Sequence, residues 1–332
     1  MSGASDRGSG HDAMAASASA AQRWPGADEL AAALVGATGS SVRAILLYGS
    51  HLTEASPDRH SAFDFFVVVE DYGAFYAGLS GAEELHRPHW LMTRMARLLP
   101  PNVIVFTPEE GVDGIAKCVI VSRDHLVRAL GPAPPDHFLL GRMVQRLGKV
   151  FLASPEDEEW IDTLLAGARG RVLEWMVPYL DAPVDAAGFG RRLLEVCYQG
   201  EFRPESRDRP ERLSAAQAGH FREQFGAVLA RGEKDGVLKR ENQMFVLAAP
   251  ASQSVRSRWR AHFRRSKVRA TLRWFKHMLT FANWLPYVVR KVERHTGRPV
   301  RLTALERKLP LIFLWPRAIK VLLTRPPREI SK

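Results

Sequence analysis

Cysteine is scarce in this sequence of 332 residues, which contains only Cys118 and Cys197, each inside an apolar run. Two separated cysteines exclude a disulfide framework and a structural zinc site built from several cysteines. Such scarcity is typical of a reducing compartment. We therefore expect both cysteines to be small, buried, apolar side chains.

Long apolar runs are also missing from the sequence. No stretch of about 18 or more apolar residues occurs, so no membrane-spanning helix is predicted. Residues 1–22 are rich in Ser, Ala and Gly and lack the apolar core of a secretory signal, so we expect a disordered tail there. The high content of Ala, Arg and Pro favours a bacterial origin.

Acidic residues are almost absent from one part of the chain. Residues 251–332 contain 21 Lys and Arg against 3 Asp and Glu, a net charge of +18. The other 250 residues contain 26 against 33, a net charge of −7, and the two values add to the +11 of the whole chain. A strongly cationic segment predicts a polyanionic partner, either an anionic membrane or nucleic acid.

The pattern of apolar residues predicts an α/β protein. Runs dense in β-branched and aromatic residues predict four strands, at 44–48, 63–69, 102–106 and 117–122. Helical patterns occupy residues 23–42, 80–98 and much of 156–232. We divide the chain into a tail (1–22), an α/β domain (23–155), a helical domain that completes the active-site cleft (156–250) and a basic amphipathic segment (251–332).

The sequence Tyr48-Gly49-Ser50, followed by a loop and by Asp64 inside a buried strand, carries the chemistry. Glycine lets the backbone approach a phosphate closely because it has no Cβ, and Ser50 with nearby amides can donate hydrogen bonds to a triphosphate. An ionised carboxylate in an apolar strand is costly unless it is paired or binds a metal. The order strand, Gly-Ser, loop and Asp-bearing strand therefore predicts a nucleotidyltransferase fold in which Asp64 holds Mg²⁺.

A second carboxylate on the Asp64 strand is lacking. The neighbouring positions on the same face are Ala62 and Phe66. This argues against a polymerase-like enzyme that must deprotonate a hydroxyl group. It is compatible with a nucleotidyltransferase whose nucleophile is already an anion.

These residues resemble the peripheral, mitochondrial-type phosphatidate cytidylyltransferases over roughly residues 44–230. Tyr48-Gly49-Ser50 and the segments 63–65 and 69–71 match the opening motifs of that family, which also has a single Asp on this strand. The segments 117–122, 146–149, 198–203, 220–223 and 225–226 match its later motifs in the same order. The segment 131–138 departs from the family as a short insertion.

The resemblance implies that CTP and phosphatidic acid give CDP-diacylglycerol, a precursor of cardiolipin and other phospholipids, with release of pyrophosphate. It implies catalytic roles for Asp64, Lys117 and Arg203. It further implies nucleotide binding by Tyr48, Gly49, Ser50, Arg146 and Lys149. Mg²⁺ would be held by Asp64 and by a second carboxylate, for which Asp136 is the first choice and Asp124 the second.

The basic segment 251–332 contains four of the eight tryptophans, at 259, 274, 284 and 315. Val268, Leu272, Phe275 and Leu279 share one helical face, with arginine and lysine beside them. Apolar stripes with Trp and cations are typical of helices at a membrane surface. We therefore predict that the protein is cytoplasmic and bound peripherally to the inner face of an anionic membrane through this segment.

Two other functions remain open from the sequence. One is a nucleotidyltransferase that acts on a small molecule or on a protein, which would not need the basic segment. The other is a nucleic-acid-binding protein that uses the segment as its contact surface. Against nucleic acid, the sequence contains no helix-turn-helix, zinc-finger or RNA-recognition signature, and the part that carries the chemistry is net acidic.

Overall fold

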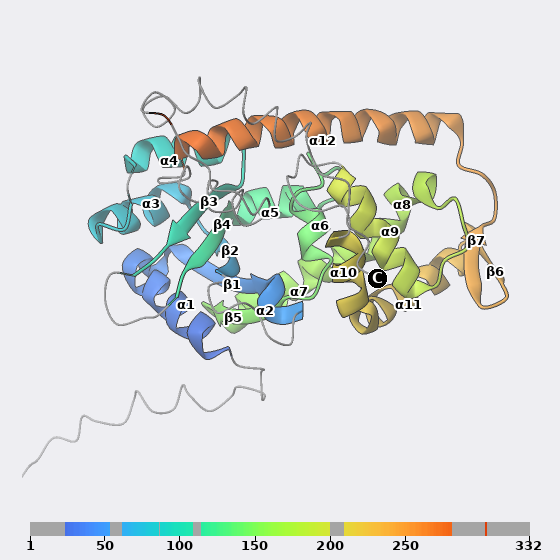
Figure 1. Cartoon of the computed structure of the whole chain (residues 1–332), viewed down its shortest axis with the longest axis horizontal. Coiled ribbons are helices and arrows are strands. Elements are labelled where there is room, and N and C mark those ends of the chain that lie inside the picture. Colours follow the sequence, from blue (N-terminus) through green and yellow to red (C-terminus); the bar gives the residue numbers. More distant parts are fainter. Residues whose placement is uncertain are drawn as a thin grey trace, which may run out of the picture.

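The computed structural model describes residues 24–53, 62–85, 87–108, 114–199, 209–280 and 303. In this part of the chain, helices surround a five-stranded mixed sheet (Figure 1), which confirms the predicted α/β class. None of the described helices is both long and apolar enough to cross a membrane.

The sheet has the strand order β3-β4-β2-β1-β5, in which β2 and β4 are parallel and all other neighbours are antiparallel. The strands are β1 (Val42–Tyr48), β2 (Phe63–Val69), β3 (Asn102–Phe106), β4 (Ala116–Ser122) and β5 (Gly148–Leu152). The central β2 is apolar on both faces because helices cover both. The four predicted strands are confirmed, whereas β5 was not predicted.

One face of the sheet is covered by three helices, α1 (Pro25–Thr38), α3 (Tyr72–Gly81) and α4 (His89–Leu98). The single helix predicted over 80–98 is wrong at its beginning. Asp71 caps α3 by accepting hydrogen bonds from the backbone N–H groups of Gly73 and Ala74, so this helix starts earlier than expected. The chain leaves helical geometry after Gly81, and α4 begins directly after Pro88.

The other face of the sheet shares one apolar core with the helices that follow it in the chain, including Phe189, Phe221 and Phe225. These helices are α5 (Arg123–Leu130), α6 (Leu140–Met143), α7 (Pro155–Gly170), α8 (Val172–Met176), α9 (Ala186–Gln199), α10 (Arg209–Ala216) and α11 (Ala218–Lys234). A small hairpin of β6 (Leu238–Glu241) and β7 (Met244–Leu247) lies beyond them. Helices α7, α9 and α11 therefore share one apolar core with the sheet.

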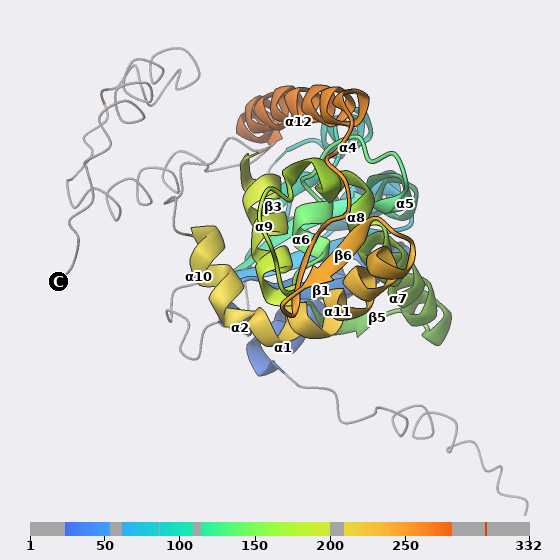
Figure 2. The ribbon, with the colours of Figure 1, turned by 90° about the vertical axis from the view of Figure 1, so that its right-hand side faces the viewer.

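The long helix α12 (Gln253–Thr280) runs along the molecule from the hairpin to α4 (Figures 1 and 2). Its inward face carries two arginines that bind Asp136, which is buried between α5 and α6. Nη2 of Arg273 lies 2.5 Å from Oδ2 of Asp136, and Nε of Arg269 lies 2.9 Å from the same oxygen. Together they form a buried ion cluster, which we call the α12 clamp.

Lys276 extends this clamp at the end of α12. Its ammonium group donates hydrogen bonds to the carbonyl oxygens of Leu99 and Pro101, which directly follow α4. Burial, together with the charges of Arg273 and Arg269, holds the pKa of Lys276 well below its usual range. The sequence placed these three cations beside an exposed apolar stripe, but the structure turns them toward the body of the protein.

We predict that Asp136→Asn lowers the free energy of unfolding by about 3–5 kcal/mol, because it leaves buried Arg273 without its counterion. Urea denaturation at pH 7 measures the effect. Asp71→Asn is the control, because it alters an exposed pair with Arg97 and should cost less than about 1 kcal/mol. Equal effects of the two substitutions would contradict the prediction.

The same carboxylate predicts an acid dependence of stability. Burial opposes the ionisation of Asp136, but Arg273, Arg269 and the backbone N–H of Phe138 outweigh it and hold the pKa below its usual value of 3.8. A depressed carboxylate pKa contributes stability that is present above pH 3.8 and is lost as the pH falls further. Between pH 5 and pH 2, the free energy of unfolding should therefore fall more steeply with decreasing pH in the wild type than in Asp136→Asn.

Candidate functional site

Three predicted site residues lie in one row across neighbouring strands. Tyr48 at the end of β1 pairs with Asp64 near the start of β2, and Asp64 pairs with Lys117 near the start of β4. Because paired residues of adjacent strands present their side chains on the same face, all three point toward the helices that follow the sheet. Residues separated by up to 69 positions in the sequence are thereby brought together.

Gly49 forms the turn that follows β1, and its backbone comes close to Asp64 of this row. Its φ of +87° is in the left-handed region, and a Cβ at this position would lie 2.8 Å from Oδ2 of Asp64. The carbonyl oxygen of Gly49 accepts hydrogen bonds from the backbone N–H of Leu52 and from the hydroxyl of Thr53, which fix the turn. Ser50 begins the short helix α2 (Ser50–Thr53) and directly follows this turn.

The charges of the row are Asp64 and Lys117. Nζ of Lys117 lies 3.7 Å from Oδ1 of Asp64, and the two side chains are 39% and 21% exposed, so the pair is open to solvent and to a ligand. The ring of Tyr48 stacks on Phe66, with 4.2 Å between the ring centroids, and closes the row on its apolar side. A carboxylate and an ammonium group at this spacing can bind a cation and an anionic oxygen side by side.

The donor set fits a magnesium ion held jointly with a nucleotide. Magnesium bound with substrate phosphates needs only one or two protein carboxylates and keeps several waters. Asp64 supplies one carboxylate, and its oxygen Oδ2 lies next to the position that a Cβ would occupy at Gly49. In the described part of the chain, no group of three or more His, Cys, Asp or Glu side chains is arranged to hold a metal ion without such a ligand.

The two residues considered as second metal ligands lie elsewhere. Asp136 is neutralised by Arg269 and Arg273 in the α12 clamp and also accepts a hydrogen bond from the backbone N–H of Phe138. Asp124 lies in the first turn of α5, directly beyond the end of β4 that is opposite to Lys117. Ser122, the last residue of β4, is five positions beyond Lys117, about 16 Å along the strand. We therefore keep Asp64 alone as the proposed protein ligand.

The predicted phosphate-binding cations Lys149 and Arg146 differ in their surroundings. Lys149 on β5 forms ion pairs of 2.8 and 2.7 Å with Glu158 and Asp162 of α7. Burial opposes its charge, but these two carboxylates outweigh it and raise the pKa of Lys149. Arg146 is exposed, and its backbone N–H donates to the side chain of Gln217 at the start of α11. Of the two, Arg146 is the more exposed to solvent.

Some predicted residues cannot be located in the site. Arg203 and the rest of the segment 200–208 lie outside the described residues, as do 281–302 and 304–332, which contain most of the basic segment. Both cysteines are buried and neither is part of a disulfide bond, as predicted. Burial, aided by the nearby carboxylate of Asp64, raises the pKa of the Cys118 thiol, so this cysteine is protonated at neutral pH.

Sequence reasoning missed one cluster of charged residues. Arg258, His262, Arg265 and Arg269 follow one another at spacings of four, three and four along α12. These spacings place them on one side of the helix, where they line a cavity with the loop Pro132–Pro135. The spacing was visible in the sequence, but the proline loop that faces it is distant in the chain.

Comparison with models of known protein families and with curated proteins finds no match. The cross-strand row, the Gly49 turn and the sequence motifs are therefore the features that point to a function.

We predict that Gly49→Ala lowers the free energy of unfolding by about 1–2 kcal/mol, because alanine in left-handed geometry is strained and its Cβ would displace Asp64. Gly36→Ala is the matched control. Gly36 lies within α1 with no atom near its missing Cβ, so alanine should raise stability by up to about 1 kcal/mol. Chemical denaturation tests both substitutions, and a Gly49→Ala protein as stable as the wild type would refute the close approach.

Proposed function

We propose that this chain is a nucleotidyltransferase and, more specifically, a phosphatidate cytidylyltransferase that joins CTP to phosphatidic acid. The observation that supports the proposal best is the row of Tyr48, Asp64 and Lys117 beside the left-handed Gly49. Its order of strand, Gly-Ser turn and Asp-bearing strand is that of the nucleotidyltransferase fold. The family resemblance of the sequence supplies the substrates.

The proposed reaction needs no general base. The phosphate of phosphatidic acid is a monoester with a second pKa of about 6, so it is largely a dianion at neutral pH. One of its oxygens forms a bond to the α-phosphorus of CTP, and the bond from that phosphorus to the β-phosphate oxygen breaks. Pyrophosphate leaves with the electron pair, and no proton has to be removed from the nucleophile.

The main obstacle is then the repulsion between two polyanions. When bound, a magnesium ion at Asp64 would supply positive charge to the nucleotide phosphates. Lys117, whose ammonium group is beside Asp64 and half-exposed, would stabilise negative charge that develops on the phosphate oxygens. The backbone at Gly49 and the hydroxyl of Ser50 would orient the triphosphate, and Arg203 stays a predicted contributor outside the described residues.

We predict that Asp64→Asn reduces cytidylyl transfer by at least about 100-fold while the protein stays folded, because the substitution keeps the size of this partly exposed side chain and removes only its charge. The assay contains labelled CTP, Mg²⁺ and phosphatidic acid in mixed micelles and detects a CDP-lipid. Asp235→Asn, at the exposed C-cap of α11 and outside the matched motifs, is the control and should keep normal turnover.

Near-normal turnover of Asp64→Asn would remove this residue from the proposed site. A wild-type protein that makes no CDP-lipid, but transfers a nucleotide to a small molecule or a protein, would instead favour the other class of nucleotidyltransferase.

The surface of α12 supports a membrane as partner. Val268, Leu272 and Phe275 are 60%, 53% and 40% exposed and lie on one side of the helix, which we call the apolar stripe. Arg264 and Lys267, also exposed, flank it. An exposed apolar row with adjacent cations is suited to an anionic bilayer, where the proposed lipid substrate resides.

We predict that Leu272→Glu weakens binding to vesicles of anionic phospholipid by about tenfold or more, since it removes an inserted apolar side chain and adds a negative charge. Sedimentation with vesicles measures it. Val127→Glu is the control, because this valine is 43% exposed but lies on α5. Equal weakening by both variants would show that net charge alone controls binding.

A further inference from the structure

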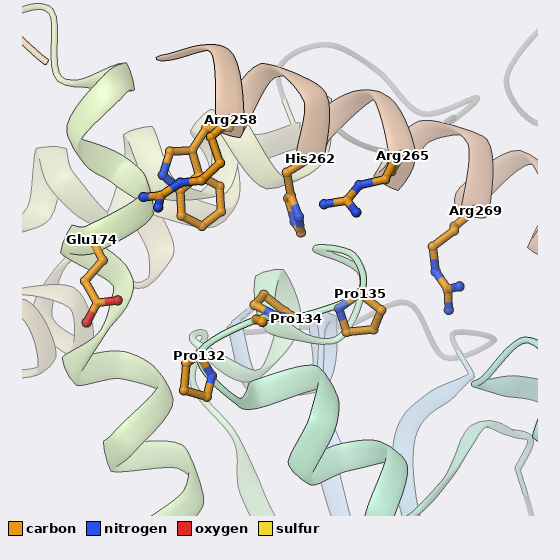
Figure 3. A pocket seen from close by; sticks show the side chains of 10 residues that line it. Pro132, Pro134, Pro135, Glu174, Arg258, His262, Arg265 and Arg269 are labelled. Carbon is orange, nitrogen blue, oxygen red and sulfur yellow. The ribbon is translucent and has the colours of Figure 1, made fainter. Parts of the chain in front are cut away.

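A cavity of about 550 Å³ lies between α12 and the loop Pro132–Pro135, with α8 at one end (Figure 3). It is separate from the cross-strand row. None of Tyr48, Asp64 and Lys117 lines the cavity, whose walls come from residues 132–135, Glu174 and residues 258–269 of α12. The function proposed above makes no use of this cavity.

The cavity is strongly cationic. Arg258, Arg265 and Arg269 line it from α12, against the single carboxylate of Glu174 from α8 (Figure 3). Arg269 is partly neutralised by Asp136, but Arg258 and Arg265 are exposed and form no ion pair with any described carboxylate. Arginine binds phosphate oxygens with two parallel hydrogen bonds, so this arrangement favours a phosphate group over other anions.

Two buried nitrogen atoms of the cavity wall lack partners. Nε2 of His262 and Nε1 of Trp259 form no hydrogen bond with any described residue, although the two side chains are only 6% and 9% exposed. Both residues line the cavity, and His262 points toward the proline loop in Figure 3. Both nitrogens are closed to solvent, so in this conformation Arg258, Arg265 and Arg269 are the groups that can contact a phosphate in the cavity.

The apolar stripe lies next to the mouth of this cavity. Val268 and Leu272 follow Arg265 by three and seven residues, so their side chains lie on the adjoining side of the same helix. The prolines of the loop contribute an apolar wall on the other side. A ligand that fills the cavity with its phosphate and covers the stripe must therefore be both anionic and apolar.

We propose that this cavity binds the phosphate headgroup of a bilayer phospholipid, whose acyl chains remain in a membrane that contacts the apolar stripe. The site would hold α12 on the membrane at one defined place, in addition to the diffuse attraction of the other cations. The inference rests on the proposed function only in its choice of a bilayer as partner, and nucleotidyl transfer at Asp64 is not required for it.

The test uses calorimetry to measure the binding of dihexanoyl phosphatidylglycerol, below its micelle concentration and at about 0.15 M salt. The pocket variant combines Arg258→Gln with Arg265→Gln. The matched control combines Arg231→Gln with Lys234→Gln, which removes the same charge from exposed positions of α11 that neither line the cavity nor flank the apolar stripe.

We expect the pocket variant to raise Kd by at least about tenfold, because it loses charge-assisted hydrogen bonds to the phosphate. The control should change Kd by less than about twofold, since its residues do not line the cavity and charges more than about 8 Å away are largely screened at this salt. Equal effects of the two variants, or none in the pocket variant, would overturn the proposal. Circular dichroism checks folding, and the single substitutions replace the pair if it unfolds.

A second arm uses inorganic phosphate and sn-glycerol 3-phosphate as ligands without acyl chains. We expect them to bind at least about tenfold more weakly than the lipid, because they bury no apolar surface. Binding as tight as that of the lipid would show that the cavity serves a free phosphate and would overturn the lipid assignment.

The experiment separates this site from the reaction. It contains no CTP, and phosphatidylglycerol is a diester without the phosphomonoester that the proposed transfer requires. Loss of the proposed enzymatic activity in a direct assay would therefore leave the binding result intact. Loss of binding would likewise leave the assignment of Asp64 and Lys117 unaffected.

Discussion

The neutralisation of buried cations by Asp136 governs how the described part of the chain is assembled. Arg269 and Arg273 reach this carboxylate from α12, and Arg273 is almost fully buried, so its charge could not remain there without its partner. Because these side chains point inward, Val268 and Leu272 must point outward. The apolar stripe and the wall of the cationic cavity both follow from this one ion cluster.

The proposed site depends on strand pairing more than on individual side chains. Asp64 meets Lys117 only because β2 and β4 pair residue by residue in parallel, and it meets the Gly49 turn only because β1 pairs with β2 on the other side. A shift of one residue would turn Asp64 to the opposite face of the sheet. Such an arrangement suits a reaction in which position and charge do the chemical work, without a general base.

Local signals in the sequence predicted most of the sheet and the centre of the site. Dense β-branched runs marked β1 to β4, and a charged residue in an apolar strand marked Asp64. The short edge strand β5 lacked such a signal, and the cap at Asp71 started α3 earlier than the apolar pattern indicated. Asp136 could not be assigned from sequence, because its partners lie 133 and 137 residues away and no local pattern announces them.

The hydrogen bonds of Lys276 have a consequence for the order of events during synthesis. The carbonyl oxygens of Leu99 and Pro101 receive their donor from a residue 175 or more positions later in the chain. When the sheet and α4 leave the ribosome, water must donate hydrogen bonds to these carbonyl oxygens in place of Lys276. The first part of the protein therefore emerges with these two carbonyl oxygens exposed to solvent. They become buried only when the helix of residues 253–280 has been made and has docked.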